Sequence, residues 1–203
     1  MRLHLITLSS LLAAAPPATA QTPAGHAGWH LGGGVEAVRF GHVAVSGGLP
    51  GTAAEIRPSP RSAVHLSAGR TLGPWAVGLE AGWAGGHVEA ANDAVSVQDR
   101  TSDVSRYRVA IGVERRVAAA GRGNLGVVLA PTLDLWTVGG ANRVRAGAEA
   151  RLVLRVALGS VALENRLAFG LSGNPVEAGD IGEVSELRGL RTVSVGIGLR
   201  FGL

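Results

Sequence analysis

The chain of 203 residues is 46% hydrophobic, contains 31 glycines and has no cysteine, so disulfide bonds and thiol chemistry contribute nothing to its fold. Its 19 basic residues, all arginine, exceed the 15 acidic residues by only four, and this near balance argues against a nucleic-acid-binding surface. Beyond the N-terminal region no continuous apolar run has the length of a membrane-spanning helix, which excludes a helical membrane protein.

The first twenty residues predict an exported protein. Arg2 precedes a short apolar run, and an A-x-A sequence ending at Ala20 follows that run. A charged start, a short apolar stretch and small residues are typical of a signal peptide. We therefore expect a signal peptide over 1–20, cleaved after Ala20, a short periplasmic segment over 21–27 and one domain over 28–203.

Eight segments of that domain alternate between apolar and polar or small residues. A period of two residues indicates strands with two unlike faces. Pro131 interrupts the apolar face of the fifth segment and predicts a bulge there. In chain order the segments are 28–40, 62–72, 75–85, 104–116, 124–137, 143–158, 161–172 and 192–203.

The connections between these segments alternate in length. Short links stand at 73–74, 117–123 and 159–160, and those of two residues are hairpin signals. The connection 138–142 breaks the rule, as a short member of the long set. Short turns on one side and longer loops on the other are typical of an outer-membrane barrel, and they predict both termini in the periplasm. The long, polar connections are 41–61, 86–103 and 173–189.

The alternation alone also fits a soluble, lipocalin-like barrel whose apolar face points inward. Three features favour an apolar face that points outward to lipid. Strands of about ten residues have the length of a tilted membrane crossing, and small residues on the polar face fit a narrow lumen. Aromatic residues also gather near the strand ends. We therefore predict an all-β fold, an eight-stranded antiparallel up-and-down transmembrane β-barrel. The expected aromatic girdles contain Trp29, Trp75 and Phe201 near the short turns, and Phe40, Trp83, Tyr107 and Phe169 near the long loops.

The same assignment of faces directs seven arginines and six carboxylates into the lumen. Charges that leave bulk water persist when they are paired, so the sequence predicts a salt-bridged and largely closed interior. The predicted lumen charge network contains Glu36, Glu80, Arg106, Arg108, Glu114, Asp134, Arg145, Glu149, Arg151, Arg155, Glu164, Arg166 and Arg200.

The last eight residues, Gly196 to Leu203, resemble the C-terminal β-signal that bacterial outer-membrane proteins present to the assembly machinery. Gly198 and Phe201 stand in the expected places, and Leu203 stands where a terminal aromatic is usual. With the signal peptide and the eight segments, the chain resembles the small OmpA/OmpX-type outer-membrane β-barrel proteins. The resemblance implies the outer membrane of a Gram-negative-type bacterium, contact with lipid and lipopolysaccharide, and insertion by the barrel-assembly machinery.

From these features we expect a structural or surface-interaction module, monomeric and without enzymatic activity, that meets extracellular ligands through 41–61, 86–103 and 173–189. A narrow pore for ions or small solutes is the alternative. We expect no cofactor and no metal, because His26 and His30 stand about 13 Å apart in an extended chain.

A lipid-modifying enzyme is a third hypothesis. His65, Ser67 and Glu80 face the lumen, and Ser172 stands at the outer end of its strand, but no histidine accompanies Ser172 as nucleophilic catalysis would require. Arginines near strand ends or in loops suit either lipopolysaccharide phosphates or ordinary interfacial anchoring. They are Arg39, Arg61, Arg70, Arg143, Arg188 and Arg191.

Overall fold

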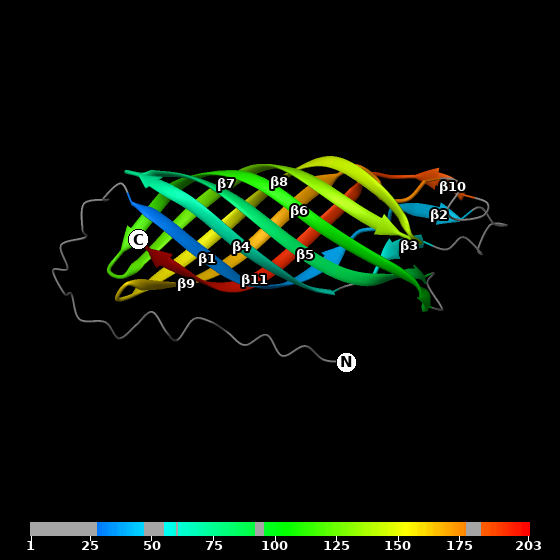
Figure 1. Cartoon of the computed structure of the whole chain (residues 1–203), viewed down its shortest axis with the longest axis horizontal. Coiled ribbons are helices and arrows are strands. Elements are labelled where there is room, and N and C mark those ends of the chain that lie inside the picture. The colour runs from blue at the N-terminus through cyan, green and yellow to red at the C-terminus, as the bar shows by residue number, and fades with distance from the viewer. Residues whose placement is uncertain (1–27, 47–54, 60, 92–95, 178–183) are drawn as a thin grey trace.

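The computed structural model describes residues 28–46, 55–59, 61–91, 96–177 and 184–203, and every regular element in these ranges is a β-strand (Figure 1). The expected signal peptide, the segment 21–27 and His26 lie outside the described residues. None of the described residues forms a helix with the length and apolar character that crossing a membrane requires.

Eight long strands form a closed barrel. Each pairs antiparallel with the next long strand along the chain, and the first pairs with the last, with Val35 opposite Ile197. The predicted eight-stranded up-and-down barrel is therefore confirmed. The strands are β1 (Trp29–Phe40), β4 (Arg61–Leu72), β5 (Trp75–Ala91), β6 (Ser96–Ala120), β7 (Gly123–Val138), β8 (Ala141–Leu158), β9 (Val161–Ser172) and β11 (Leu190–Gly202).

Two of the predicted long loops contain short strands that extend the sheet beyond the barrel. The strands β2 (Ala44–Ser46), β3 (Glu55–Pro58) and β10 (Val184–Leu187) add to β5 in the order β10-β2-β3-β5. They lie beyond the end of the barrel opposite the C-terminus (Figure 1). We call this group, together with the adjoining ends of β5 and β6, the outer sheet.

The prediction of a loop over 86–103 is wrong for most of that range. The strand β5 continues to Ala91 and β6 begins at Ser96, and these two residues pair with each other. This extension pairs with β3 on its other edge, so its backbone groups find partners although the sequence there is polar. Only 92–95 of the predicted loop lie outside the description.

The short turns lie at the other end of the barrel, where 73–74 and 159–160 are as predicted and the third turn is tighter. The connection predicted over 117–123 is reduced to 121–122, because β6 runs to Ala120 with a register shift at Val117. Gly73, Gly121 and Gly159 adopt φ values of 65°, 54° and 73°, a left-handed conformation that glycine adopts without steric cost.

Pro131 does not produce the predicted bulge. The register between β7 and β8 runs through it unbroken, with Pro131 opposite Ala148. Towards β6 the pairing stops after Ala110 and resumes at Val113 in the same register. Proline lacks the N–H that this side of the ladder needs, so the result is a gap in the pairing without an inserted residue.

The alternation of faces is seen in the burial of side chains. Large apolar residues cover the outside, among them Leu66, Ile111, Leu133 and Val195, while the charged residues between them are buried inside. Six predicted girdle aromatics also point outward: Trp29, Trp75, Trp83, Tyr107, Phe169 and Phe201.

Phe40 is the exception and corrects the girdle prediction. It follows the outward-facing Arg39, so the two-residue period turns its ring inward, where it is buried. The ring packs edge-on against Trp136, with 5.6 Å between the ring centroids.

Candidate functional site

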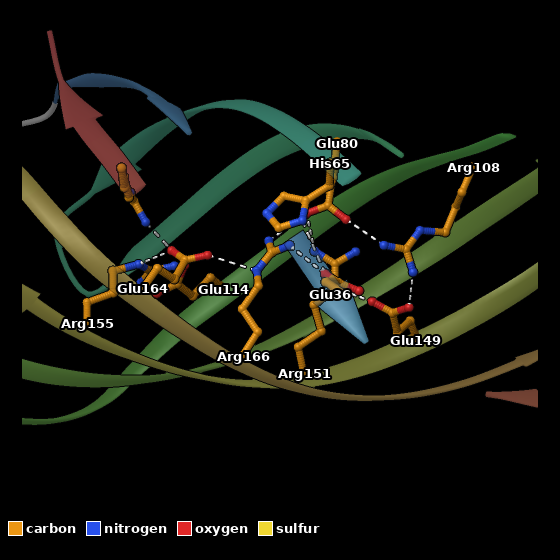
Figure 2. Close-up of polar contacts among 11 residues, drawn as sticks. Glu36, His65, Glu80, Arg108, Glu114, Glu149, Arg151, Arg155, Glu164 and Arg166 are labelled. Carbon is orange, nitrogen blue, oxygen red and sulfur yellow. Dashed lines mark hydrogen bonds and ion pairs between the residues drawn. The ribbon is translucent and has the colours of Figure 1, made fainter. Parts of the chain in front are cut away.

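The lumen contains a connected set of ion pairs between five carboxylates and five arginines. Its members come from β1, β5, β6, β8, β9 and β11, so the set crosses the barrel interior from wall to wall (Figure 2). We call it the central network: Glu36, Glu80, Glu114, Glu149 and Glu164 with Arg108, Arg151, Arg155, Arg166 and Arg200.

Glu80 is the most highly connected carboxylate and is only 4% exposed. Arg108 Nη2 donates to its Oε1 at 2.8 Å, and Arg151 Nη1 and Arg166 Nη2 donate to its Oε2 at 2.8 and 2.5 Å. Arg108 and Arg151 also share Glu149. One carboxylate thus compensates part of three buried positive charges that strands β6, β8 and β9 supply.

The network continues along the barrel through Arg166 and Arg155. Arg166 Nη1 donates to Glu36 at 3.1 Å, and its Nε lies 2.8 Å from Glu164. Arg155 Nε donates to the other oxygen of Glu164 at 2.6 Å, and its two terminal nitrogens bind both oxygens of Glu114. Two-point contacts of this kind restrict the orientation of both groups and make the stronger class of ion pair.

Arg200 is the member of the network nearest the C-terminus. It lies 3.6 Å from Glu114, and its Nη2 lies 2.9 Å from His30 Nδ1 and donates to Thr71 Oγ1 at 3.1 Å. His30 is therefore held in the lumen. Among the described residues, no group of three or more His, Cys, Asp or Glu side chains is placed to hold a metal ion.

The groups considered for hydrolysis do not assemble into a catalytic set. The Nδ1 atom of His65 lies 3.4 Å from Glu36 Oε1, and both side chains are buried within the barrel. The hydroxyl of Ser67 lies over Gly32. Ser172 donates a long hydrogen bond, 3.4 Å, to the carbonyl of Gly173.

Three predicted lumen residues lie outside the central network. Arg106 donates to Asp134 at 2.8 Å, and Asp134 is 0% exposed. Arg145 lies at the mouth nearest the outer sheet, where it donates to Glu177 and to the carbonyl of Asn174, at 2.8 and 2.5 Å.

A buried apolar cluster that the sequence pattern did not predict lies at that same mouth. Trp136 is 1% exposed, and the Arg106 guanidinium lies 5.4 Å from its ring centroid in a cation–π contact. Loop residues complete the cluster: the side chain of Asn174 donates to the carbonyl of Val43 at 2.7 Å, and this holds the two loops together. We call this cluster the apolar plug: Val38, Phe40, Val43, Val104, Trp136, Val138, Val176 and Leu190.

Two small voids lie among the described side chains inside the barrel. One of about 60 Å³ lies beside Glu80 and Arg151, and one of about 20 Å³ lies beside Glu36 and Arg108. At the short-turn end the lumen opens into a cavity of about 400 Å³, lined in part by Arg116, Arg155, Ser160 and Arg200. We call that cavity the vestibule.

Inward-facing glycines provide the space for the charged side chains. Gly196 pairs with both Glu36 and Arg166 in the neighbouring strands, and a Cβ at this position would lie 2.6 Å from Glu36 Cγ. At Gly202 a Cβ would meet no atom within 4 Å.

We therefore expect Gly196→Val to lower the free energy of unfolding by about 1–3 kcal/mol through overpacking. Gly202→Val, which adds the same atoms in open space, should change it by less than about 0.5 kcal/mol. Urea unfolding of the refolded barrel measures both values. Equal losses would show that the glycine does not make room for Glu36.

Solved structures with a similar fold are bacterial outer-membrane proteins. The chain superposes on Neisserial surface protein A with a TM-score of 0.61 at 12% identity, covering 88% of this chain and 99% of that one. For the outer membrane protein OprG from Pseudomonas aeruginosa the TM-score is 0.60 at 10% identity, covering 87% and 96%. For the outer membrane protein AlkL in lipid bilayers it is 0.54 at 11%, covering 94% and 96%.

No protein-family model matches the chain, and no curated protein does. At these identities the likeness concerns the fold. It confirms the predicted class, a small eight-stranded outer-membrane β-barrel, and the exposed apolar belt agrees with a location in the outer membrane.

Proposed function

We propose that this barrel is closed to solutes and serves as a structural or surface-interaction module of the outer membrane, acting as a monomer inserted by the barrel-assembly machinery. The observation that carries the proposal is the absence of a wide passage among the described residues. Between the vestibule and the apolar plug, the two voids that lie among the described residues have volumes of about 60 and 20 Å³. A cavity of about 10–15 Å³ holds one water molecule, so these two voids have room for a few waters and not for a larger solute.

The outer sheet supports the interaction part of the proposal. It projects beyond the barrel from the end that the apolar plug seals, and strands from three parts of the chain form it (Figure 1). A rigid scaffold that carries exposed loops is a common arrangement for binding at a surface. One neighbour in fold is itself named a surface protein.

A narrow pore is the second candidate function, and the lining of the vestibule favours it. Glu114, Arg155 and Arg200 line both the vestibule and the 60 Å³ void, so polar groups continue from one to the other. An enzymatic role receives less support, because the described contacts of His65 join it to Glu36 and not to a nucleophile.

Planar-bilayer recording on the refolded protein tests closure against conduction. The closed barrel should give no stable current steps at any moderate voltage. Ion-selective steps that disappear or change selectivity in Glu149→Gln or Arg151→Gln would establish the pore instead.

The proposed topology places the outer sheet and the turn at 139–140 outside the cell, and the turns at 73–74, 121–122 and 159–160 in the periplasm. Because the chain has no cysteine, single-cysteine variants report orientation without background. On intact cells a membrane-impermeant maleimide should label Asn142→Cys and should leave Ser160→Cys unlabelled until the outer membrane is opened. The reverse labelling pattern would show that the barrel has the opposite orientation in the membrane.

We also propose that Gly198, Phe201 and Leu203 act as the assembly signal. Phe201→Ser should then reduce the amount of folded barrel in cells several-fold, while refolding of the purified chain into detergent changes little. Phe169→Ser is the matched control, because Phe169 is also an exposed, lipid-facing aromatic near a strand end. Equal losses in cells for both variants would show that Phe201 acts only as a membrane anchor.

A further inference from the structure

A crevice of about 490 Å³ lies at the rim of the barrel where β9 and β11 meet the outer loops. Its walls include Leu171, which is exposed on the lipid-facing side of β9, and Arg191, which is exposed on β11. Gly41 and Gly189 contribute no side chains, and this leaves the crevice open between the barrel wall and the loops.

Two exposed arginines lie here on the outer face of the barrel: Arg191 lines the crevice, and Arg39 lies beside it on β1. Arg191 pairs in register with Leu171, and Arg39 on β1 pairs with Val193, so the two arginines lie on neighbouring strands two residues apart. Such diagonal neighbours are separated by about 7–8 Å, a spacing that two long guanidinium side chains bridge to one anion. No ion-pair partner for Arg39 or Arg191 is found in the part of the chain that the structure describes.

A third arginine lies on the crevice wall and is held in place by its neighbours. Arg188 Nη1 lies 3.1 Å from His42 Nε2, and the other ring nitrogen of His42 lies 3.4 Å from Glu55. The backbone N–H of Arg188 donates to the carbonyl of Val43 at 2.8 Å. These contacts fix Arg188, and with it this wall of the crevice, against the outer loops.

An apolar strip runs from the arginines towards the middle of the membrane. Across β11, β9 and β8, one row of paired residues contains Val193, Phe169 and Ala150, and the next contains Leu171 and Ala148. These side chains are exposed on the lipid face, and the two alanines are smaller than the apolar side chains beside them.

We propose that the crevice and this strip bind one phosphorylated, acylated glycolipid of the outer leaflet. Its phosphate lies between Arg39 and Arg191, and its acyl chains lie along the apolar strip. Arginine binds phosphate through paired N–H donors, and at a membrane surface a basic group above an apolar strip matches both parts of such a lipid. The site rests on the proposed topology, because this rim must face the outer leaflet.

The test compares two pairs of outward-facing arginines at opposite rims. Protein purified from outer membranes is incubated in detergent with bisphosphorylated lipid A, and native mass spectrometry counts the lipids that remain bound. Arg39→Ala/Arg191→Ala removes the proposed site. Arg70→Ala/Arg115→Ala removes the same charge from exposed positions at the short-turn rim. Gel mobility with and without heating verifies that each variant is folded, and the corresponding glutamine pairs replace any alanine pair that is not.

The unaltered protein and the short-turn pair should each retain one lipid A, and Arg39→Ala/Arg191→Ala should bind at least tenfold more weakly. Lipid A without its phosphates should bind the unaltered protein as weakly as that variant binds the intact lipid. Equal binding by both pairs, or undiminished binding of the dephosphorylated lipid, would overturn the proposal and leave the arginines as interfacial anchors. Loss of lipid A binding confined to the short-turn pair would place the site at the opposite rim and would contradict the proposed topology.

Discussion

Replacing Glu80 with glutamine is expected to lower the free energy of unfolding by about 3–5 kcal/mol, because it leaves buried charges without their partner. Arg108, Arg151 and Arg166 all donate to this carboxylate, and the change keeps the volume of the side chain while removing its charge. Urea unfolding of the barrel in phospholipid, followed by tryptophan fluorescence, measures the loss.

Glu177→Gln provides the matched control. Glu177 also contacts two arginines, Arg145 at 2.8 Å and Arg143 at 3.4 Å, but its side chain is 60% exposed. Water compensates exposed charges, so its loss should amount to about 0–1 kcal/mol. If Glu80→Gln were as mild as this control, the central network would contribute little to stability.

Ile111→Arg should prevent the barrel from inserting into bilayers. Ile111 is 56% exposed on the outer face of β6, and an arginine there lies against hydrocarbon at a cost of about 2–4 kcal/mol near the midplane. The loss is a large fraction of the roughly 5–15 kcal/mol by which folded proteins are stable, so the folded fraction on a heat-modifiability gel should fall sharply.

Ile111→Leu keeps the apolar character of this position and should insert as the unaltered protein does. If Ile111→Arg also inserted normally, and Val109→Ala/Ile111→Ala abolished binding of a soluble hydrophobic ligand, the apolar face would point inward. A lipocalin-like barrel would then replace the membrane barrel.

The barrel is predictable from the sequence because one simple rule governs each long strand. An apolar side chain at every second position is needed where the two faces of a strand meet unlike surroundings, here lipid and the lumen, so alternation reveals both the strand and its faces. The inward parity of Glu80 and Arg166 follows from the same rule, although the particular partners of each do not. Which side chains form ion pairs across the lumen depends on which residues of opposite strands lie at the same level along the barrel axis. That is set by the closure and register of the whole barrel.

Other features depend on contacts that no local pattern encodes. The inward parity of Phe40 and Trp136 was readable in the sequence, but their burial also requires loop residues such as Val43 to fold over the mouth. The length of β5 and β6 beyond the membrane likewise depends on their pairing with each other and with β3, because the sequence there lacks strong alternation.

Quenching of single tryptophans tests the central claim, that the apolar face meets lipid and the lumen is closed, more directly than any other measurement. Of the four tryptophans, Trp83 is exposed on the outer face and Trp136 is buried in the apolar plug. In variants that retain only one of them, with phenylalanine at the other three positions, lipids with brominated acyl chains should quench Trp83 strongly. Trp136 should respond neither to these lipids nor to acrylamide in the water. Quenching of Trp136 by acrylamide would show an open, hydrated lumen. Quenching of Trp136 by the brominated lipids, with Trp83 unquenched, would show that the face assigned to the lumen meets lipid instead.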